Sequence, residues 1–155
     1  MPQRRERATI GPLSDDTPTL GLPAARPNRK AAPTPGLTIL WHPDVSRVGE
    51  RVRLWLDPTP TDLSRRAPVF ASADGRTGGP LDDPYVSRKT AWLSAPSAGV
   101  IELTVDERAV VNVDRDEVRG SIRIDSARLD RGVVITLSRR VALFLHRMSE
   151  PTLQD

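Results

Sequence analysis

Apolar and polar residues alternate in several short segments after residue 36. In residues 51–56 every second side chain is apolar, and the same period of two recurs in residues 101–105, 111–113 and 122–124. A period of two belongs to an extended chain with one buried and one solvated face. The pattern predicts strands whose buried residues are Val52, Leu54, Leu56, Ile101, Leu103, Val105, Val111, Val113, Ile122 and Ile124.

Three further apolar segments complete the predicted set of strands. Residues 37–41 open the folded region, and His42-Pro43-Asp44 ends that strand with turn-forming residues. Residues 132–137 and 141–145 are separated only by Ser138-Arg139-Arg140, a connection short enough for a β-hairpin. We therefore expect the last two strands to pair antiparallel.

Two segments also fit a helix. Val141, Leu145 and Met148 would share one helical face, and residues 106–118 contain good helix formers. The β-branched runs 110–111 and 133–135 favour a pleated surface instead. Many short strands without long helices between them predict an all-β, two-sheet β-sandwich and not an α/β fold.

Proline divides the chain near Gly36. Proline has no backbone N–H, so a segment rich in it cannot complete a regular hydrogen-bond ladder. The sequence predicts a disordered Pro-rich arm over residues 1–36, a folded domain over residues 37–148 and a flexible tail over residues 149–155. The prolines of the arm are Pro2, Pro12, Pro18, Pro23, Pro27, Pro33 and Pro35.

Composition argues against several classes of protein. Lys and Arg number 23 against 20 Asp and Glu, a net charge of +3 that is too small and diffuse to indicate nucleic-acid binding. No cysteine is present, so disulfides and thiolate metal sites are excluded. No segment approaches the roughly 20 apolar residues that span a bilayer. We expect a cytoplasmic protein with no cofactor, metal, membrane or direct nucleic-acid partner.

Two short motifs lie in order among the predicted strands. Ser64-Arg65 ends an early strand, and residues 81–92 contain Val86-Ser87-Arg88 followed by Ala91. These motifs resemble the Gly-Arg and Val-Ser-Arg motifs of forkhead-associated (FHA) domains, and residues 129–135 resemble that family's approach to its closing hairpin. The chain is similar in particular to the N-terminal FHA domains of bacterial enhancer-binding transcriptional activators.

The resemblance implies an FHA/SMAD-like sandwich whose loops at one end bind phosphothreonine peptides. Phosphothreonine carries nearly two negative charges and three strong acceptor oxygens, and a guanidinium group matches that geometry. Arg65, Ser87 and Arg88 are the site residues that the resemblance implies. The implied function is that of a signalling module, regulatory in a bacterial kinase-linked or transcriptional pathway.

The chain also departs from the family pattern. Thr90 stands where the family commonly has histidine, and Asp114-Arg115 stands where it has an Asn-Gly turn. An acid at this position repels phosphate, although Arg115 would offset Asp114, and Asn112 would supply an amide in a shifted register. The departures favour an alternative, a degenerate domain that serves as a phosphate-independent docking or dimerisation surface.

Other chemistry-bearing residues have simpler interpretations. The only histidines are His42 and His146, and neither has a metal-ligating or catalytic partner nearby in the sequence, so we expect no enzyme activity. Residues 75–79 are expected to be a surface loop, and Asp82-Asp83-Pro84 a turn. The tryptophans lack the spacing of a stacking platform and are expected to be packing residues: Trp41, Trp55 and Trp92.

The arm adds one hypothesis about regulation. Asp15-Asp16 precede Thr17, and Thr19 follows shortly, which makes an acidic threonine site accessible to a Ser/Thr kinase. Once phosphorylated, Thr17 or Thr19 would bind Arg65 and Ser87 of the same chain. The alternative is that the acids precede these threonines by accident.

Overall fold

A computed structural model describes residues 34–56 and 59–149. The predictions for residues 1–33 and for Glu150 onward lie outside these residues. Strands dominate the described part, which also contains one 3-10 turn, η3 (Val45–Arg47), and one short helix, α2 (Ser126–Arg131). The strands are β2 (Thr34–Trp41), β3 (Arg51–Arg53), β4 (Thr61–Leu63), β5 (Phe70–Ala71), β6 (Thr77–Gly79), β7 (Ala91–Ser97), β8 (Val100–Val105), β9 (Val111–Val113), β10 (Asp116–Glu117), β11 (Ser121–Ile124), β12 (Val133–Leu137) and β13 (Val141–Met148).

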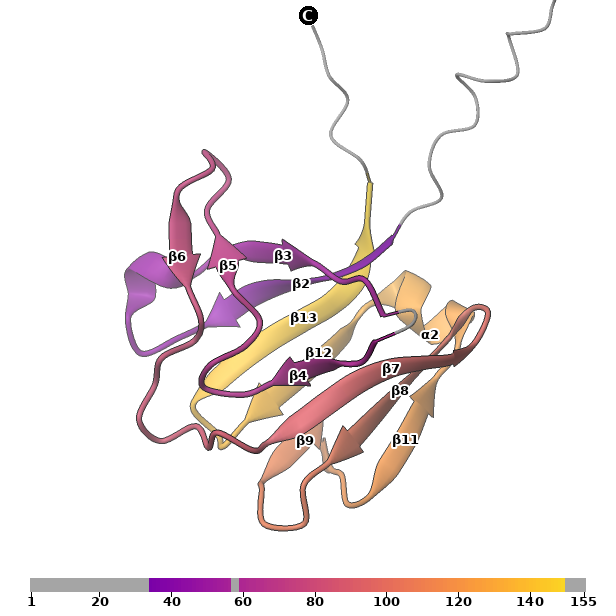
Figure 1. Cartoon of the computed structure of the whole chain (residues 1–155). Coiled ribbons are helices and arrows are strands. Elements are labelled where there is room, and N and C mark those ends of the chain that lie inside the picture. Colours follow the sequence, from indigo (N-terminus) through magenta and orange to yellow (C-terminus); the bar gives the residue numbers. More distant parts are fainter. Residues whose placement is uncertain (1–33, 57–58, 150–155) are drawn as a thin grey trace, which may run out of the picture. The chain divides into compact units, whose positions relative to one another are not determined.

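The strands form two antiparallel sheets, and the predicted all-β sandwich is confirmed (Figure 1). The larger sheet has the order β10-β9-β12-β13-β2-β3-β5-β6, and the smaller has the order β11-β8-β7-β4. β12 and β13 pair antiparallel through the predicted hairpin. The segments that also fitted a helix are strands, since Val111–Val113 pairs with β12 and Val141–Met148 pairs with β2.

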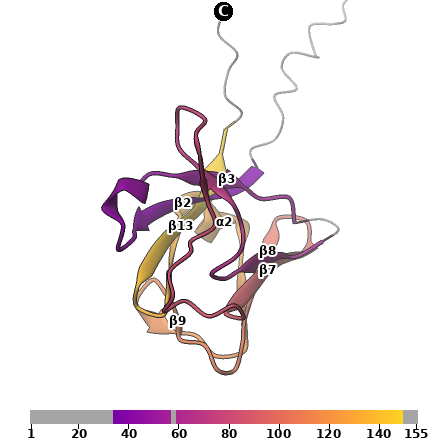
Figure 2. The same ribbon diagram turned by 60° about the vertical axis from the view of Figure 1, so that its left-hand side comes forward.

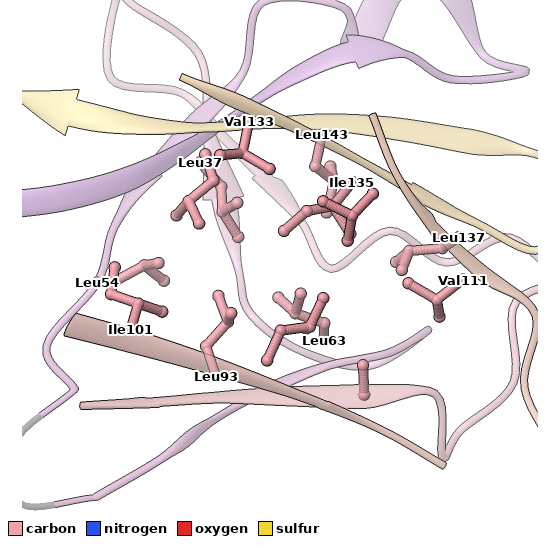
Figure 3. Packing of buried hydrophobic residues seen from close by; sticks show 14 of the residues in the cluster. Leu37, Leu54, Leu63, Leu93, Ile101, Val111, Val133, Ile135, Leu137 and Leu143 are labelled. Atoms are coloured by element: carbon pink, nitrogen blue, oxygen red, sulfur yellow. The ribbon is translucent and has the colours of Figure 1, made fainter. Parts of the chain in front are cut away.

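The core lies between the two sheets (Figure 2). Figure 3 shows Leu63, Leu93 and Ile101 of the smaller sheet facing Ile135 and Leu143 of the larger one. Burial alternates along β8, β12 and β13, as the period of two predicted. Each buried side chain removes apolar surface from water, at roughly 25 cal/mol per Å², so this layer is the main favourable term for the fold.

The predictions for residues 75–79 and 51–56 are wrong in part, and one short helix was not predicted. Residues 75–79 are not a plain loop, because Thr77–Gly79 forms β6 and pairs with β5. The region before β12 is helical: the Asp125 carboxylate caps α2 by accepting from the N–H of Arg128 at 2.8 Å, and Gly132 ends the helix with φ of 86°. The predicted strand at residues 51–56 is shorter, since pairing stops at Arg53, yet Leu54 and Leu56 remain buried.

The tryptophans are not packing residues. Trp41, Trp55 and Trp92 are exposed by 54%, 66% and 38%, so that expectation is also wrong. In β2 the reason is a bulge in the pairing with β13, where Ala142 pairs with Trp41 but Leu143 pairs with Ile39. A bulge re-aims side chains relative to the alternating pattern. The pattern of hydrophobic residues in the sequence does not reveal such a bulge.

Gly132 is required by both its conformation and its neighbour. Its φ is positive, and a Cβ at this position would lie 2.1 Å from Cζ of the Phe144 ring. We expect Gly132→Ala to lower the free energy of unfolding by roughly 1–3 kcal/mol because the backbone is strained and the ring must move. Urea denaturation followed by circular dichroism measures this. Gly99→Ala, also at positive φ but in open space, isolates the backbone contribution.

Candidate functional site

The segment between β6 and β7 forms a loop that is fixed from several sides. It runs past the turn between β12 and β13 (Figure 1). Leu81 and Val86 are fully buried in the core, and Thr90 is buried at the end that leads into β7. We call residues 81–90 the phosphate loop, after the role predicted for it. Its ordered backbone is a property that a preorganised binding site needs.

Two buried side chains fix the start of the phosphate loop. His42 Nδ1 accepts the N–H of Asp44 at 3.0 Å, so the ring proton lies on Nε2, which donates to the Leu81 carbonyl at 2.8 Å. Arg47 donates to the Gly79 and Leu81 carbonyls at 2.8 and 3.1 Å. It also donates to the Pro80 carbonyl.

The charge of Arg47 is balanced by a buried carboxylate. Arg47 Nε and Nη2 both donate to Oε1 of Glu50, at 3.0 and 2.7 Å. The two residues are only 8% and 9% exposed. Because every other donation of Arg47 goes to a backbone carbonyl of residues 79–81, the pair ties the turn after β2 to the start of the phosphate loop.

A second ion pair fixes the middle of the loop. Asp83 is 2% exposed and accepts from Arg140 Nε at 3.1 Å and from the N–H of Tyr85 at 2.8 Å. The predicted turn at Asp82-Asp83-Pro84 is confirmed, since the N–H of Val86 returns to the Asp83 carbonyl at 2.9 Å. The Arg140 guanidinium lies 4.5 Å from the centre of the Tyr85 ring, which stays 70% exposed.

Arg65 supports the loop by hydrogen bonds to its backbone. Its Nε and Nη2 donate to the Val86 and Pro84 carbonyls at 2.9 and 2.7 Å, and its own N–H donates to the Ser87 carbonyl at 3.1 Å. A guanidinium has five N–H donors. Nη1 and one N–H of Nη2 therefore stay available to a ligand.

The predicted residues Ser87 and Arg88 are both exposed on this fixed loop. The Ser87 hydroxyl oxygen accepts the N–H of Lys89 at 3.0 Å, which leaves its O–H free to donate. Thr90, which replaces the family's histidine, donates its hydroxyl to the Ser87 carbonyl at 2.9 Å. Thr90 therefore fixes the backbone of Ser87 from inside the protein and does not face a ligand.

A hollow of about 430 Å³ opens beside Ser87. Its arginines come from two different segments, Arg108 before β9 and Arg139 in the turn between β12 and β13, and no acidic residue lines it. Neither arginine side chain has an ion-pair partner within residues 34–56 and 59–149. The lining residues are Tyr85, Ser87, Arg108, Ala109, Val110, Ser138 and Arg139.

The turn between β12 and β13 determines where Arg139 lies. Ser138 and Arg139 both have positive φ, 54° and 56°, and the N–H of Arg140 donates to the Leu137 carbonyl at 2.9 Å. Positive φ at both central residues is the geometry of a tight two-residue hairpin. This strained turn carries Arg139 to the hollow and Arg140 to Asp83.

The structure does not bring all the predicted site residues together. Asp114 and Arg115 form the turn between β9 and β10, where Asp114 exchanges hydrogen bonds with the backbone of Val134 and pairs with Arg128 at 3.2 Å. Val110, directly before β9, lines the hollow instead. The three residues of β9 lie between Val110 and Asp114, so the two positions are four residue steps apart, about 13 Å.

Asn112 also lies away from the hollow, on β9 opposite Thr136 of β12. Because Asp114 lies at the far end of that strand, its charge does not oppose a ligand at Ser87. The sequence argument missed Arg108 and Arg139. Of the two, only Arg139 could have been found from the sequence, because it lies in the predicted connection of the hairpin. The hypothetical phosphorylation sites Thr17 and Thr19 lie outside the described residues.

A larger hollow, of about 610 Å³, lies between the starts of β2 and β8 and the segment after β3. Its lining is mainly apolar, and its one arginine, Arg147, is already paired with Asp130 at 2.5 Å. It therefore offers no free positive charge to an anionic ligand. Among residues 34–56 and 59–149, no group of three potential metal ligands gathers, and no helix is long and apolar enough to cross a membrane.

The comparisons with known proteins identify no family for this chain. No protein-family model matches it, and no curated protein matches its sequence.

Proposed function

We propose that the chain is a phosphothreonine-peptide-binding module, with its site at the phosphate loop. The observation that supports this best is the hollow beside Ser87, where Arg108 and Arg139 converge without an acidic partner among the described residues. Arginines on a protein surface usually pair with a carboxylate or extend into solvent, each independently of the others. Two of them directed to one hollow beside a free hydroxyl form a site for a compact anion.

The chemistry of each residue follows from its surroundings. The Ser87 hydroxyl donates to one phosphate oxygen, while Arg108 and Arg139 bind the others and neutralise the dianion. Arg65 positions the loop through Pro84 and Val86, and its spare N–H groups add positive charge behind Ser87. Arg88 lies next to Ser87 and contributes charge at the rim. Tyr85 offers an exposed ring to the peptide.

A binding function, and not catalysis, fits the two histidines. Both ring nitrogens of His42 are occupied by backbone groups. His146 contacts the Thr38 hydroxyl at 2.8 Å and the Arg147 carbonyl at 3.1 Å. Neither ring is placed as a general base beside the hollow.

The direct test is calorimetric titration with a degenerate phosphothreonine peptide library and with the same library unphosphorylated. We expect binding only to the phosphorylated library. Arg108→Gln and Arg139→Gln should each weaken it roughly 10- to 100-fold, the effect of one charge-assisted hydrogen bond. Arg65→Ala should also weaken it, and here circular dichroism must first establish that the variant folds.

Arg115→Gln is the matched control, because it removes one positive charge from the far end of β9. Phosphopeptide affinity should be unchanged in this variant. Equal losses for Arg115→Gln and Arg139→Gln would contradict the placement of the site. Binding that ignores the phosphate would support the alternative function, a docking surface of a degenerate domain.

The partner we propose is a phosphothreonine in another protein or in the chain's own arm, produced by a Ser/Thr kinase. Thr17 lies 17 residues before Thr34, a span of at most about 56 Å when extended. Thr34 pairs with Met148 at one end of β13, whereas the hollow lies near Val141 at the other end, about 23 Å away. The arm is therefore long enough for binding in cis. We place this function in a cytoplasmic signalling or transcriptional pathway.

A further inference from the structure

The outer face of the larger sheet carries no Asp, Glu, Lys or Arg on the four adjacent strands β9, β12, β13 and β2. Burial alternates along β9, β12 and residues 141–146 of β13, so the partly exposed residues there point away from the core. Pairing with β13 places Thr38 and Trp41 of β2 on the same outer face. Arg147 is in phase with buried Leu145 and lines the larger hollow, on the other side of the sheet. The Phe144 and His146 rings stack at 5.0 Å in the middle of this face. We call it the central face, and its residues are Thr38, Leu40, Trp41, Asn112, Val134, Thr136, Ala142, Phe144 and His146.

The smaller sheet provides the comparison. Its outward positions include Asp62 on β4, Glu102 on β8 and Arg123 on β11, and Glu102 lies opposite Arg123. A solvated antiparallel face normally carries such polar and charged residues. The central face lacks charged residues, and its polar residues are only Thr38, Asn112, Thr136 and His146. The smaller sheet packs against the opposite side of the larger sheet and does not cover this face (Figure 2).

The bulge in β2 adds apolar surface to the central face. It turns both Leu40 and Trp41 outward, and they are 41% and 54% exposed. Trp41 lies opposite Ala142, which lies opposite Thr136. A large ring therefore stands beside two small side chains in one row across the sheet. The Trp41 ring thus extends further from the sheet than the two side chains beside it.

A neighbouring row has opposite charges at its two ends. Pairing joins Arg51 to Thr38, Thr38 to Phe144, and Phe144 to Val134. Val134 in turn exchanges hydrogen bonds with Asp114, whose carboxylate also pairs with Arg128 of the same chain at 3.2 Å but keeps 49% of its side chain exposed. Arg51 and Asp114 are thus separated by four strand spacings, about 19 Å, with Phe144 halfway between them. Arg51 is exposed and has no ion-pair partner among the described residues.

We propose that the central face is the interface of a symmetric dimer of this chain, with the two-fold axis at Phe144 and parallel to the strands. This surface is separate from the phosphate loop. Such an axis reverses the order of the strands in the second sheet. At one end of the row Arg51 faces the partner's Asp114, and at the other end Asp114 faces the partner's Arg51. The same operation places Trp41 over the partner's Thr136, beside the partner's Ala142. Charge and shape are therefore self-complementary, as a two-fold interface requires.

Sedimentation equilibrium over a range of protein concentrations tests the proposal. We expect the apparent mass to rise from 17.0 kDa toward twice that value. Arg51→Glu places like charges together and should raise the dimer dissociation constant at least roughly tenfold. In an Asp114→Asn background the same substitution should change it less than about threefold, because the opposing acid has been removed.

Arg123→Glu is the matched control, an equal charge reversal on the outer face of the smaller sheet. It should leave the dissociation constant unchanged, and circular dichroism should show the same fold for all variants. A chain that stays monomeric up to millimolar concentration overturns the proposal. An Arg51→Glu effect that is equal in both backgrounds, or that is matched by Arg123→Glu, also overturns it.

Discussion

Replacing Arg47 with Met is expected to lower the free energy of unfolding by roughly 3–5 kcal/mol. The substitution keeps an unbranched side chain of similar length but removes the cation. Glu50, at 9% exposure, is left as a buried carboxylate without its partner. The carbonyls of Gly79, Pro80 and Leu81 lose their donor as well. Breaking a buried pair from one side costs far more than the pair contributes as a whole, because the remaining charge stays desolvated.

Urea denaturation followed by tryptophan fluorescence measures this effect, and the midpoint should shift with little change in slope. The control is Arg76→Met, since Arg76 pairs with Asp74 in an exposed turn and its loss should not measurably change stability. Glu50→Gln separates the two roles of Arg47. It removes the ion pair but keeps the hydrogen bonds to residues 79–81, so it should cost less than Arg47→Met. Equal stability of Arg47→Met and Arg76→Met would refute this account.

Asp83→Asn should reduce both stability and phosphopeptide binding. Asp83 accepts from Arg140 and from the N–H of Tyr85 in the middle of the phosphate loop, and it is 2% exposed. An asparagine is neutral and directs an amide donor toward Arg140 or loses the bond to Tyr85. We expect a loss of roughly 1.5–3 kcal/mol in the free energy of unfolding, the contribution of a charge-assisted hydrogen bond. Binding should weaken at least roughly tenfold, because Ser87 and Tyr85 lose their fixed positions.

Asp82→Asn is the matched control for this prediction. The two substitutions are identical, adjacent and equal in their change of net charge, but Asp82 is exposed. Asp82 has φ of 54°, a conformation that asparagine tolerates. Its substitution should therefore leave stability and binding nearly unchanged. If Asp82→Asn weakens binding as much as Asp83→Asn, the anchor formed by Asp83 and Arg140 is not what positions the loop.

Most of the fold could be predicted from the sequence because strand formation leaves a local pattern. Ile101, Leu103 and Val105 are buried as the alternation indicated, and the hairpin of β12 and β13 follows from its short connection. The helix α2 could also have been found, since Asp125 and Gly132 are ordinary cap residues at the right spacing. The bulge in β2 could not, because no residue type specifies it.

The candidate site was only half predictable. Arg65 and Ser87 were named from motifs, and the structure places the Arg65 N–H against the Ser87 carbonyl. Asp114 was assigned to the same site because Asp114-Arg115 takes the place of the family's Asn-Gly turn, and the sequence does not show that this turn lies at the end of β9 away from the hollow. Arg108 and Arg139 belong to no sequence motif that would mark them as binding residues. They reach the hollow only because Val110 and Ser138 are hydrogen-bonded neighbours across β9 and β12.

The sequence by itself determined most of the long strands and, outside the bulge in β2, which of their faces is buried, because both depend on a repeat of two residues within one segment. It did not predict β5, β6, β7 or β10. The tertiary structure alone decided which charges meet. Asp83 and Arg140 are 57 positions apart, and Arg47 binds carbonyls 32 to 34 positions away. Such contacts depend on the order of strands within the two sheets. The packing of the whole core selects that order, and no single segment encodes it.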